Sequence, residues 1–529
     1  MLLLFIISII IILILFRSYL NRNYNYWSDR GLNGPKPWIW FGNTLEELFR
    51  PISVIDRERR QKYGPTYGIF ESNEPIMMTS DPQLIKNILI KDFNIFRNTR
   101  PALLTPSDHP IYRYVIDNTG DDCWLRMRSV IRTLFTDQKL RAMAKNIDNN
   151  LVDLTNSLDR LLVDQSTTGV DIRQLFVNQS IDLMGSVMFS WKPNSFNEPN
   201  NKITRLMKRL FFPSKWRILA NLVLPKFMLQ VLNMSNIIST EALDVFAKLT
   251  VDEYSKRQTS VSTDTYEDFF QSLLNRCPEF MGESSDNKTV GQSEMSKIDQ
   301  MMSKDEVVAN MFSLFQGGFD GHSLSMTFII YELAINPECQ QKVYEEIMTC
   351  YRDRDSDNSS NNRTTIDGQL FDWESLVKLD YLDACISEAM RLHAAVNRDG
   401  RVANQDYTDA TTGVTIEKDQ VIQFSRSAVQ RSADYYPMPD QFIPDRFLKH
   451  NRHQLIDSAY LPFGLGRRMC PGYRFGLMAI KLTMAHLLMR YKFLKLNNNQ
   501  TVFKTNPIVE HYTYCPEMLL LKIEKRTVN

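Results

Sequence analysis

One short segment near the C-terminal end, residues 463–472 (FGLGRRMCPG), constrains this chain more than any other part of it. Its cysteine, Cys470, stands just before a largely apolar, helix-forming run over residues 475–490. Backbone N–H groups at the start of a helix lower the pKa of a nearby thiol, and cysteine binds a metal as the thiolate. Pro471 suits the first position of a helix, and Gly466 allows a tight turn before the cysteine. The segment therefore predicts a metal-binding cysteine at a helix start.

The same segment spells F-x-x-G-x-R-x-C-x-G and resembles the cysteine loop of the cytochrome P-450 family of haem-thiolate monooxygenases. A buried structural cysteine beside a Pro-Gly turn is the alternative, but a chance match to these fixed positions is expected in roughly one of ten thousand chains. The resemblance implies haem b (iron protoporphyrin IX) with Cys470 as the axial iron ligand, and thiolate donation of this kind favours O–O cleavage. The other haem-binding residues that it implies in this loop are Phe463, Gly466, Arg468 on a propionate, and Gly472 close to the macrocycle.

Composition excludes several other kinds of protein. The chain has 529 residues, with 62 Lys and Arg against 61 Asp and Glu, so it has no excess charge with which to bind nucleic acid. Its seven cysteines include no C-x-x-C pair, which argues against both a disulfide framework and a zinc site. No phosphate-binding glycine loop and no flavin or nicotinamide domain is recognisable, so electrons have to come from another protein.

The resemblance implies that this electron donor is an NADPH-cytochrome reductase, with a cytochrome b-type protein as a further candidate. Basic residues near Trp124, with Arg467 and Arg474, predict a docking face for an acidic reductase. The expected substrate is a lipophilic small molecule such as a xenobiotic, a steroid or a fatty acid. Residues 331–337 (YELAINP) are most similar to animal microsomal members that oxidise steroids and xenobiotics.

Residues 1–20 predict a membrane anchor, because the first 16 residues carry one polar side chain, Ser8, and the stretch reaches the roughly 20 residues that cross a bilayer. A cleavable signal peptide is the competing interpretation, but the chain has neither a basic start nor an A-x-A-like cleavage site. Arginines lie only on the C-terminal flank, which predicts that the rest of the chain faces the cytosol. The resemblance to microsomal members implies the endoplasmic reticulum membrane.

After the anchor we expect a polar, Pro-rich linker over residues 21–37 and a haem-thiolate catalytic domain over residues 38–529. The expected fold class is mainly α with small β-sheets (α+β), the cytochrome P-450 fold, in which one long central helix crosses the haem. Residues 303–336 predict that helix, since Ser303 and Glu306 form a capping box and Asn336-Pro337 ends it.

Other segments carry weaker predictions. Residues 122–146 predict one basic helix, and residues 282–297 and 353–365 predict surface loops because they are rich in polar residues. Residues 206–232 mix apolar and basic side chains, which suits either an interfacial membrane element or ordinary core helices.

Two further groups of residues match the family. Glu388 and Arg391 share one helix face at i, i+3 spacing, and the resemblance joins them with Arg446 in a buried polar network that supports the cysteine loop. Trp124 and Arg128 match a W-x-x-x-R pattern that binds a haem propionate, and Arg401 falls where related members place another propionate-binding arginine. The alternative for each arginine is a solvated surface charge.

The expected oxygen-binding groove departs from the family pattern. Residues 316–323 (QGGFDGHS) align with A-G-x-D/E-T-T, so Gly317, Gly318 and Asp320 match the groove, where the acid relays protons. The family's threonine, which helps to deliver protons, is Gly321 here, and general acid-base help is typically worth roughly 10²–10⁴-fold. His322 does not replace it, because one helical step of about 100° turns its side chain away from that face.

This departure leaves two alternatives to a monooxygenase. One is a haem-thiolate isomerase or dehydratase that acts on peroxides and needs neither O2 nor a reductase. The other is a non-catalytic haem protein that binds hydrophobic ligands. The monooxygenase is the favoured hypothesis, with Asp320, Gly321, Gly317 and Gly318 as its catalytic residues.

Overall fold

The computed structural model describes residues 22–100, 109–163, 169–212, 214–224, 226–232, 234, 238–259, 267–278, 301–358, 373–496 and 518–526. The expected anchor over residues 1–20 lies outside these residues, as does the expected loop over residues 282–297. Among the helices in the described ranges, none combines the length and the apolar character that a membrane crossing requires.

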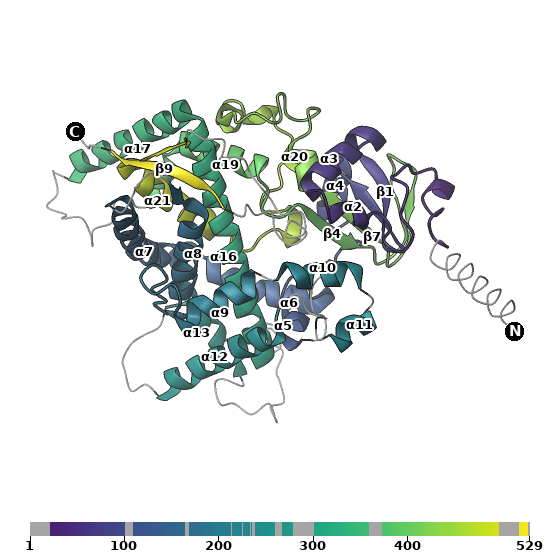
Figure 1. The fold of residues 1–529 in the computed structure, drawn as a ribbon, viewed down its shortest axis with the longest axis horizontal. Helices are drawn as coiled ribbons and strands as arrows, with labels where there is room; N and C mark the ends of the chain where they lie inside the picture. The colour runs from purple at the N-terminus through teal and green to yellow at the C-terminus, as the bar shows by residue number, and fades with distance from the viewer. Residues whose placement is uncertain are drawn as a thin grey trace, which may run out of the picture.

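Most of the described chain is helical, and the helices surround α16 (Lys304–Ile335), the longest of them (Figure 1). The other main helices are α3 (Ile52–Tyr63), α5 (Pro110–Tyr114), α6 (Asp121–Arg132), α7 (Asp137–Val163), α8 (Ile172–Phe189), α9 (Lys202–Phe211), α10 (Lys215–Val223), α11 (Lys226–Val231), α12 (Thr240–Thr259), α13 (Phe269–Leu274), α17 (Pro337–Asn358), α19 (Asp380–Leu392) and α21 (Tyr473–Arg490). Short helices are α2 (Thr44–Glu47), α4 (Pro82–Lys86), α18 (Trp373–Val377) and α20 (Arg426–Gln430).

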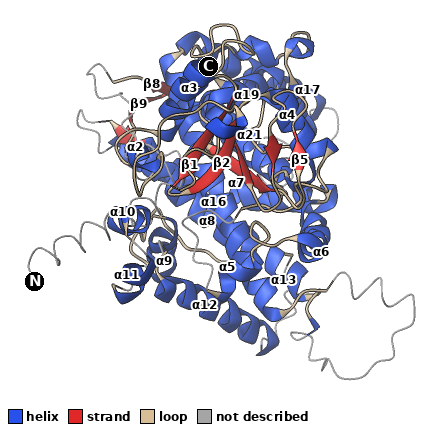
Figure 2. Cartoon of the chain, turned by 90° about the vertical axis from the view of Figure 1, so that its right-hand side faces the viewer, coloured by secondary structure: helices blue, strands red, loops and turns tan. Residues whose placement is uncertain are grey.

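The strands form small sheets beside this helical body (Figure 2). The largest has the order β1 (Thr66–Glu71), β2 (Glu74–Thr79), β7 (Val421–Ser425) and β4 (Arg398–Val402), with β2 and β7 parallel and the other neighbours antiparallel. A second sheet joins β3 (Val170–Asp171), β9 (Leu520–Lys525) and β8 (Tyr491–Leu494), and a third pairs β5 (Tyr407–Thr408) with β6 (Thr415–Ile416). The predicted fold class, mainly helical with small sheets, is confirmed.

The central helix begins and ends where its caps dictate. The Oγ of Ser303 accepts a hydrogen bond from the backbone N–H of Glu306, whose side chain accepts one from the N–H of Ser303, so the capping box is present. Asn336 follows the last turn and Pro337 starts the next helix. Most side chains of α16 are buried, because α8, α5, α19 and α21 pack around it. The prediction of a buried central helix is therefore confirmed.

Three local predictions are wrong. The basic helix expected over residues 122–146 is broken at residues 133–136 by a 3-10 turn, which separates α6 from α7. The loop expected from residue 353 begins later, since α17 continues to Asn358. Pro471 is not the first helical residue: α21 begins at Tyr473 and Gly472 is its N-cap.

The expected linker includes residues that pack into the fold. Trp27 is 3% exposed, and its indole N–H donates to the main-chain oxygen of Ile69 on β1 at 3.0 Å. Gly68 makes this packing possible, because a Cβ there would lie 2.2 Å from the Trp27 ring. Trp38, by contrast, is 63% exposed. The chain is thus attached to the sheet well before residue 38.

We expect Trp27→Ala to lower the free energy of unfolding by about 3–5 kcal/mol, because it removes a large buried side chain and leaves a cavity. Trp38→Ala is the matched control and should change stability by less than about 0.5 kcal/mol, since its ring is mostly in solvent. Urea unfolding of both variants measures the difference. Equal effects would contradict the packing of residue 27 on β1.

Candidate active site

The cysteine loop is a tight turn that only glycine allows at two positions. Gly464 and Gly466 have φ of +74° and +75°, in the left-handed region that side chains rarely adopt. A Cβ on Gly466 would also lie 2.1 Å from the main-chain oxygen of Leu89, so the loop touches the backbone of a neighbouring helical turn. The N–H of Cys470 donates to the main-chain oxygen of Phe463 at 2.8 Å, which closes the turn.

The thiol of Cys470 is held in a buried setting. Burial raises its pKa, while a hydrogen bond from the N–H of Gly472 and the nearby charges of Arg128 and Arg426 lower it. Burial is the largest of these causes, so the protein groups alone leave the pKa above its ordinary value. The N–H at the helix start lowers the pKa of the thiol, as predicted, but burial outweighs it. The second glycine of the motif, Gly472, lies against Phe135, whose ring would be 3.3 Å from a Cβ there.

Arginines from several segments converge beside this loop. The guanidinium of Arg468 donates to the main-chain oxygens of Arg97 at 2.6 Å and Thr119 at 2.9 Å, and lies 4.3 Å from the centre of the Trp124 ring. Arg128 donates to the main-chain oxygen of Met469 at 2.6 Å. Burial, and then the charge of Arg401, lower the pKa of Arg468 to about 10. Burial is the larger cause, and the contribution of Arg401 indicates that cations gather in one recess.

Arg401 on strand β4 and Arg426, the residue after β7, complete the recess. Arg401 donates to Asp399 Oδ1 at 2.7 Å, and Arg426 contacts the other oxygen of the same carboxylate at 3.4 Å. Among the residues that the structure describes, the Nε groups of Arg97, Arg401 and Arg426 are buried without a hydrogen-bond partner. A buried donor without an acceptor is costly, so these groups suit an anionic ligand.

The recess fits the two propionates of a haem. Its cations are Arg97, Arg128, Arg401, Arg426 and Arg468, and the carboxylates that act on Arg468 are Asp117 and Asp399. Sequence reasoning found Arg128, Arg401 and Arg468 but missed Arg97, Arg426 and both acids. No motif marks the missed residues: Arg426 reaches the site because β4 pairs with β7, with Arg398 opposite Ser425.

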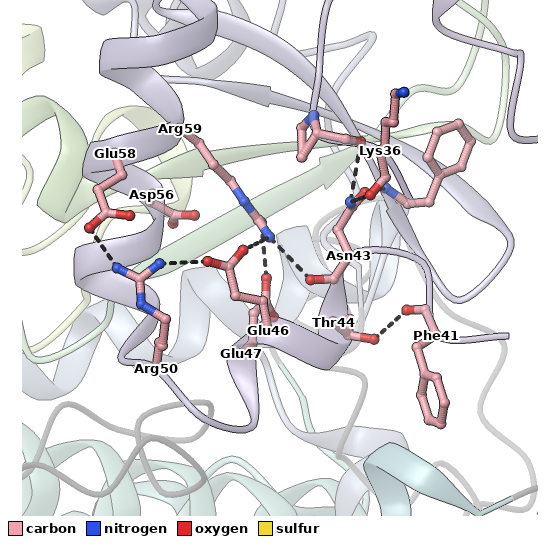
Figure 3. Close-up of polar contacts among 12 residues, drawn as sticks. Lys36, Phe41, Asn43, Thr44, Glu46, Glu47, Arg50, Asp56, Glu58 and Arg59 are labelled. Atoms are coloured by element: carbon pink, nitrogen blue, oxygen red, sulfur yellow. Dashed lines mark hydrogen bonds and ion pairs between the residues drawn. The ribbon is translucent and has the colours of Figure 1, made fainter. Parts of the chain in front are cut away.

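Strand β4 is held from its other face by a second set of charges. Successive side chains of a strand point to opposite faces, so Arg398 points away from the face of Asp399 and Arg401. Arg398 donates to both oxygens of Asp56, at 2.8 and 2.5 Å, and to Glu47 at 2.9 Å. Arg59 of α3, drawn beside Glu46 and Glu47 in Figure 3, donates to Glu47 at 3.3 Å. This ionic network ties the strand to α2 and α3.

The central helix presents an open face in its middle. A Cβ on Gly317 or Gly321 would meet no atom within 4 Å, and Gly317 is exposed although α16 is otherwise largely buried. Residues four apart lie on one helix face, so the two glycines leave one hollow on that face. Gly318 is different: a Cβ there would lie 2.3 Å from Met184 Sδ on α8. The expectation that Gly318 opens the groove is wrong, because this glycine allows close helix packing.

Two titratable side chains in this part of α16, His322 and Asp320, differ in their surroundings and in their pKa shifts. His322 is buried and bonds Ser180 Oγ through Nδ1 at 3.0 Å, and burial lowers its pKa to about 3. It faces α8, as the helical step predicts. Asp320 is partly accessible, yet burial raises its pKa to about 7, while the charge of Arg173 acts in the opposite direction. Asp320 is three residues from Gly317 and adjacent to Gly321, so it lies beside the hollow that they leave, and its pKa suits proton exchange near neutral pH.

Glu388, Arg391 and Arg446 form one buried network. Arg391 binds both oxygens of Glu388, at 2.7 and 2.8 Å, and donates to the main-chain oxygens of Gln430 and Pro439. Arg446 reaches Glu388 Oε1 at 3.3 Å. Gln430 extends the network, because its side-chain oxygen accepts the N–H of Leu461, two residues before Phe463. The network thereby supports the start of the cysteine loop.

The fold defines the chain as a mainly helical, single-domain protein with one long central helix, small sheets and a cysteine loop beside which arginines gather. A sequence model of the family described as Cytochrome P450 matches residues 32–513, and the chain therefore belongs to the cytochrome P450 family. It is accordingly an oxidoreductase, a monooxygenase that uses haem iron.

Curated relatives agree with this assignment. The chain is 28% identical over 521 residues to cytochrome P450 3A28 of Bos taurus, a match that covers 97% of this chain and 94% of the relative. It is 27% identical over 489 residues to cytochrome P450 3A30 of Fundulus heteroclitus, with 91% of each chain covered. It is 26% identical over 489 residues to cytochrome P450 9c1 of Drosophila melanogaster, with 88% of each covered.

Removing Arg391 should be far more costly than removing an exposed arginine. We expect Arg391→Met to destabilise the protein by about 3–5 kcal/mol, since it leaves the buried Glu388 carboxylate with less compensation. Arg50→Met is the control, because Arg50 forms ion pairs with Glu46 and Glu58 at the surface and should cost less than about 1 kcal/mol. Urea unfolding compares them, and similar losses would refute a buried role for the pair.

The pKa of Asp320 predicts a pH-dependent stability difference. Its folded-state pKa of about 7 exceeds the ordinary 3.8, so the carboxyl's contribution is fully present below pH 4 and is lost as the pH rises through 7. Asp320→Asn should therefore gain about 2 kcal/mol relative to wild type between pH 4 and pH 8, less than the full shift implies because water reaches the side chain. Urea unfolding at both pH values tests this, with the exposed Asp252→Asn as control. A constant difference would show that folding does not raise the pKa of Asp320.

Proposed function

We propose that this protein is a membrane-anchored haem-thiolate monooxygenase that inserts one oxygen atom from O2 into a lipophilic substrate, a xenobiotic, a steroid or a fatty acid. Its electrons come from a separate NADPH-dependent reductase, with a cytochrome b-type protein as a further donor. The observation that carries the proposal is the position of Cys470 beside buried arginine donors that lack an acceptor. A dianionic haem b meets both requirements, because it supplies two propionates and an iron that binds thiolate.

Each residue has a distinct part in this proposal. Cys470 would ligate the haem iron, Phe463, Gly466 and Gly472 shape its loop, and Trp124 packs against Arg468. Arg128, Arg401 and Arg468 hold the propionates, and Arg97 and Arg426 join them. When bound, the haem supplies oxygen activation and the transfer of one oxygen atom. Asp320 holds and releases a proton on the wall of the hollow that Gly317 and Gly321 leave open.

Asp320 also favours a monooxygenase over the two alternatives. Oxygen activation consumes protons, whereas rearranging a peroxide or sequestering a ligand requires no proton supply. A carboxyl whose pKa is raised to about 7 on the wall of the hollow is suited to that supply. Loss of the family's threonine therefore removes one proton donor and leaves another.

We place the anchor over residues 1–20, the linker over residues 21–37 and the catalytic domain over residues 38–529, on the cytosolic side of the endoplasmic reticulum membrane. Exposed apolar side chains on and beside α10 and α11 support contact of the catalytic domain with lipid: Trp216 is 74% exposed and Val231 is 83% exposed. Large exposed apolar groups beside basic residues are typical of an interfacial surface.

The reductase would dock near Arg467. Arg474, the other basic residue expected at this docking face, is partly neutralised by an ion pair with Asp137.

A ferrous carbon monoxide spectrum of the purified protein tests the proposal. We expect the far-red-shifted Soret band of a thiolate-ligated haem in wild type and its loss in Cys470→Ala. The buried Cys385→Ala is the control, because this thiol lies on α19 and should leave the band unchanged. A band that survives the change at position 470 would refute the assigned ligand, and dependence of product formation on added reductase tests the electron source.

Restoring a threonine at position 321 should improve the coupling of electron use to product. Space is available, because a Cβ there meets no atom within 4 Å. We expect Gly321→Thr to lower the hydrogen peroxide released per substrate oxidised by at least about twofold, since an added hydroxyl orders water near Asp320. Peroxide and product are measured in the same reaction, with Gly321→Val as the control of equal shape. An unchanged or higher leak in the threonine variant would contradict the proton-delivery argument.

A further inference from the structure

Asp117 lies in the short segment between α5 and α6, and the central helix fixes its position. Asn310 of α16 accepts the N–H of Ile116 at 3.1 Å and donates to the main-chain oxygen of Tyr114 at 3.1 Å. One turn further along α16, Ser313 Oγ donates to Asp117 Oδ2 at 3.2 Å. The hydroxyl of Thr99 donates to the main-chain oxygen of Asp117 at 2.5 Å. The backbone around Asp117 is therefore fixed by Thr99 and Asn310, and Ser313 orients its carboxylate.

This carboxylate is on the wall of the hollow described above. Ser313, Gly317 and Gly321 follow one another at four-residue spacing, so the serine that binds Asp117 shares the open face of α16. Asp117 is exposed, although the surrounding protein raises the pKa of its carboxyl. The carboxyl is thus surrounded by protein atoms on the side of α16 and still accessible.

Charged side chains surround the carboxylate of Asp117, but none of those described forms an ion pair with it. Arg468 and Arg128 lower its pKa and Asp399 raises it, but burial outweighs them. In the part of the chain that the structure describes, no ion pair includes Asp117, and the bond to Ser313 is the one found for its carboxylate oxygens. Under the proposed function the two arginines bind propionates, so Oδ1 remains available to a molecule that enters the hollow.

We propose that Asp117, oriented by Ser313, is a binding subsite for the cationic nitrogen of a lipophilic amine substrate. The inference rests on the proposed function and names the substrate class of the same site. The open face of α16 at Gly317 and Gly321 leaves room for the hydrocarbon part, and the carboxylate beside it selects a positive charge. A charged amine entering a poorly hydrated space requires such a counter-ion, because an unpaired charge there is strongly disfavoured.

The test compares a phenylalkyl trimethylammonium ion with its uncharged isostere, in which a tert-butyl group replaces the trimethylammonium. Neither probe has a lone pair, so neither ligates the iron, and both are titrated against the haem-containing protein by the change in Soret absorbance. We expect Asp117→Asn and Asp117→Ser to weaken ammonium binding about tenfold or more relative to the neutral probe, a change of about 1.4 kcal/mol or more. Ser313→Ala should weaken ammonium binding less than the Asp117 variants do, because it removes the group that orients the carboxylate but keeps its charge. The exposed Asp252→Asn is the control and should keep the wild-type ratio.

The outcomes separate this inference from the proposed function. A wild-type protein without the far-red-shifted carbon monoxide band refutes the haem-thiolate proposal itself. If that band is present in all variants and the ratio of the two dissociation constants does not change, the subsite is refuted and the proposed function stands. If both Asp117 variants lose haem, the carboxylate serves to hold the arginines of the recess, and the subsite is equally refuted.

Discussion

An excess of buried positive charge beside Cys470 is the constraint on which the rest of this structure depends. Guanidinium groups from the segment before α6, from α6 itself, from β4, from α20 and from the cysteine loop meet in one recess, and few carboxylates balance them. Buried charges of one sign repel, and donors without acceptors are costly. Such an arrangement persists only where rigid elements hold it, and it is suited to a dianionic cofactor.

Two buried networks hold these elements. Arg391, Glu388 and Gln430 connect α19 to the residue two before Phe463, so they support the loop that carries the thiol. On the other side, Arg398 anchors β4 to α2 and α3 through Glu47 and Asp56. Arg398 and Arg401 lie on opposite faces of one short strand. The ion pairs of Arg398 outside the recess therefore help to fix the position of Arg401 inside it. The scaffold and the site are therefore electrostatically coupled.

The central helix combines packing with an opening. Glycine is unfavourable in a helix interior by about 1 kcal/mol each, yet α16 has three within five residues. Gly318 allows contact with Met184 of α8, whereas Gly317 and Gly321 leave space on the face that also carries Ser313. The burial of the remaining turns stabilises the helix around this gap. One element thereby provides both the core of the fold and a wall of the site.

The sequence by itself determined the features that depend on neighbouring residues. The capping box at Ser303, the long helix that follows it, the tight turn at Gly466 and the mainly helical class all result from local backbone preferences or from short motifs, and the structure confirms them. Errors at this level were also local: the break near residue 133 has no proline or glycine to mark it. Membership of the family followed from the same short motifs.

Only the tertiary structure decided which charges meet. Arg97, Arg426, Asp117 and Asp399 carry no motif, and they reach the site because strand pairing and the packing of α16 bring together residues that are hundreds of positions apart. The same packing decided that Gly318 faces a helix while Gly317 faces a hollow, and that burial raises the pKa of Cys470 in spite of the helix start. Contact between distant segments and the degree of burial depend on the whole fold, which a local pattern does not contain.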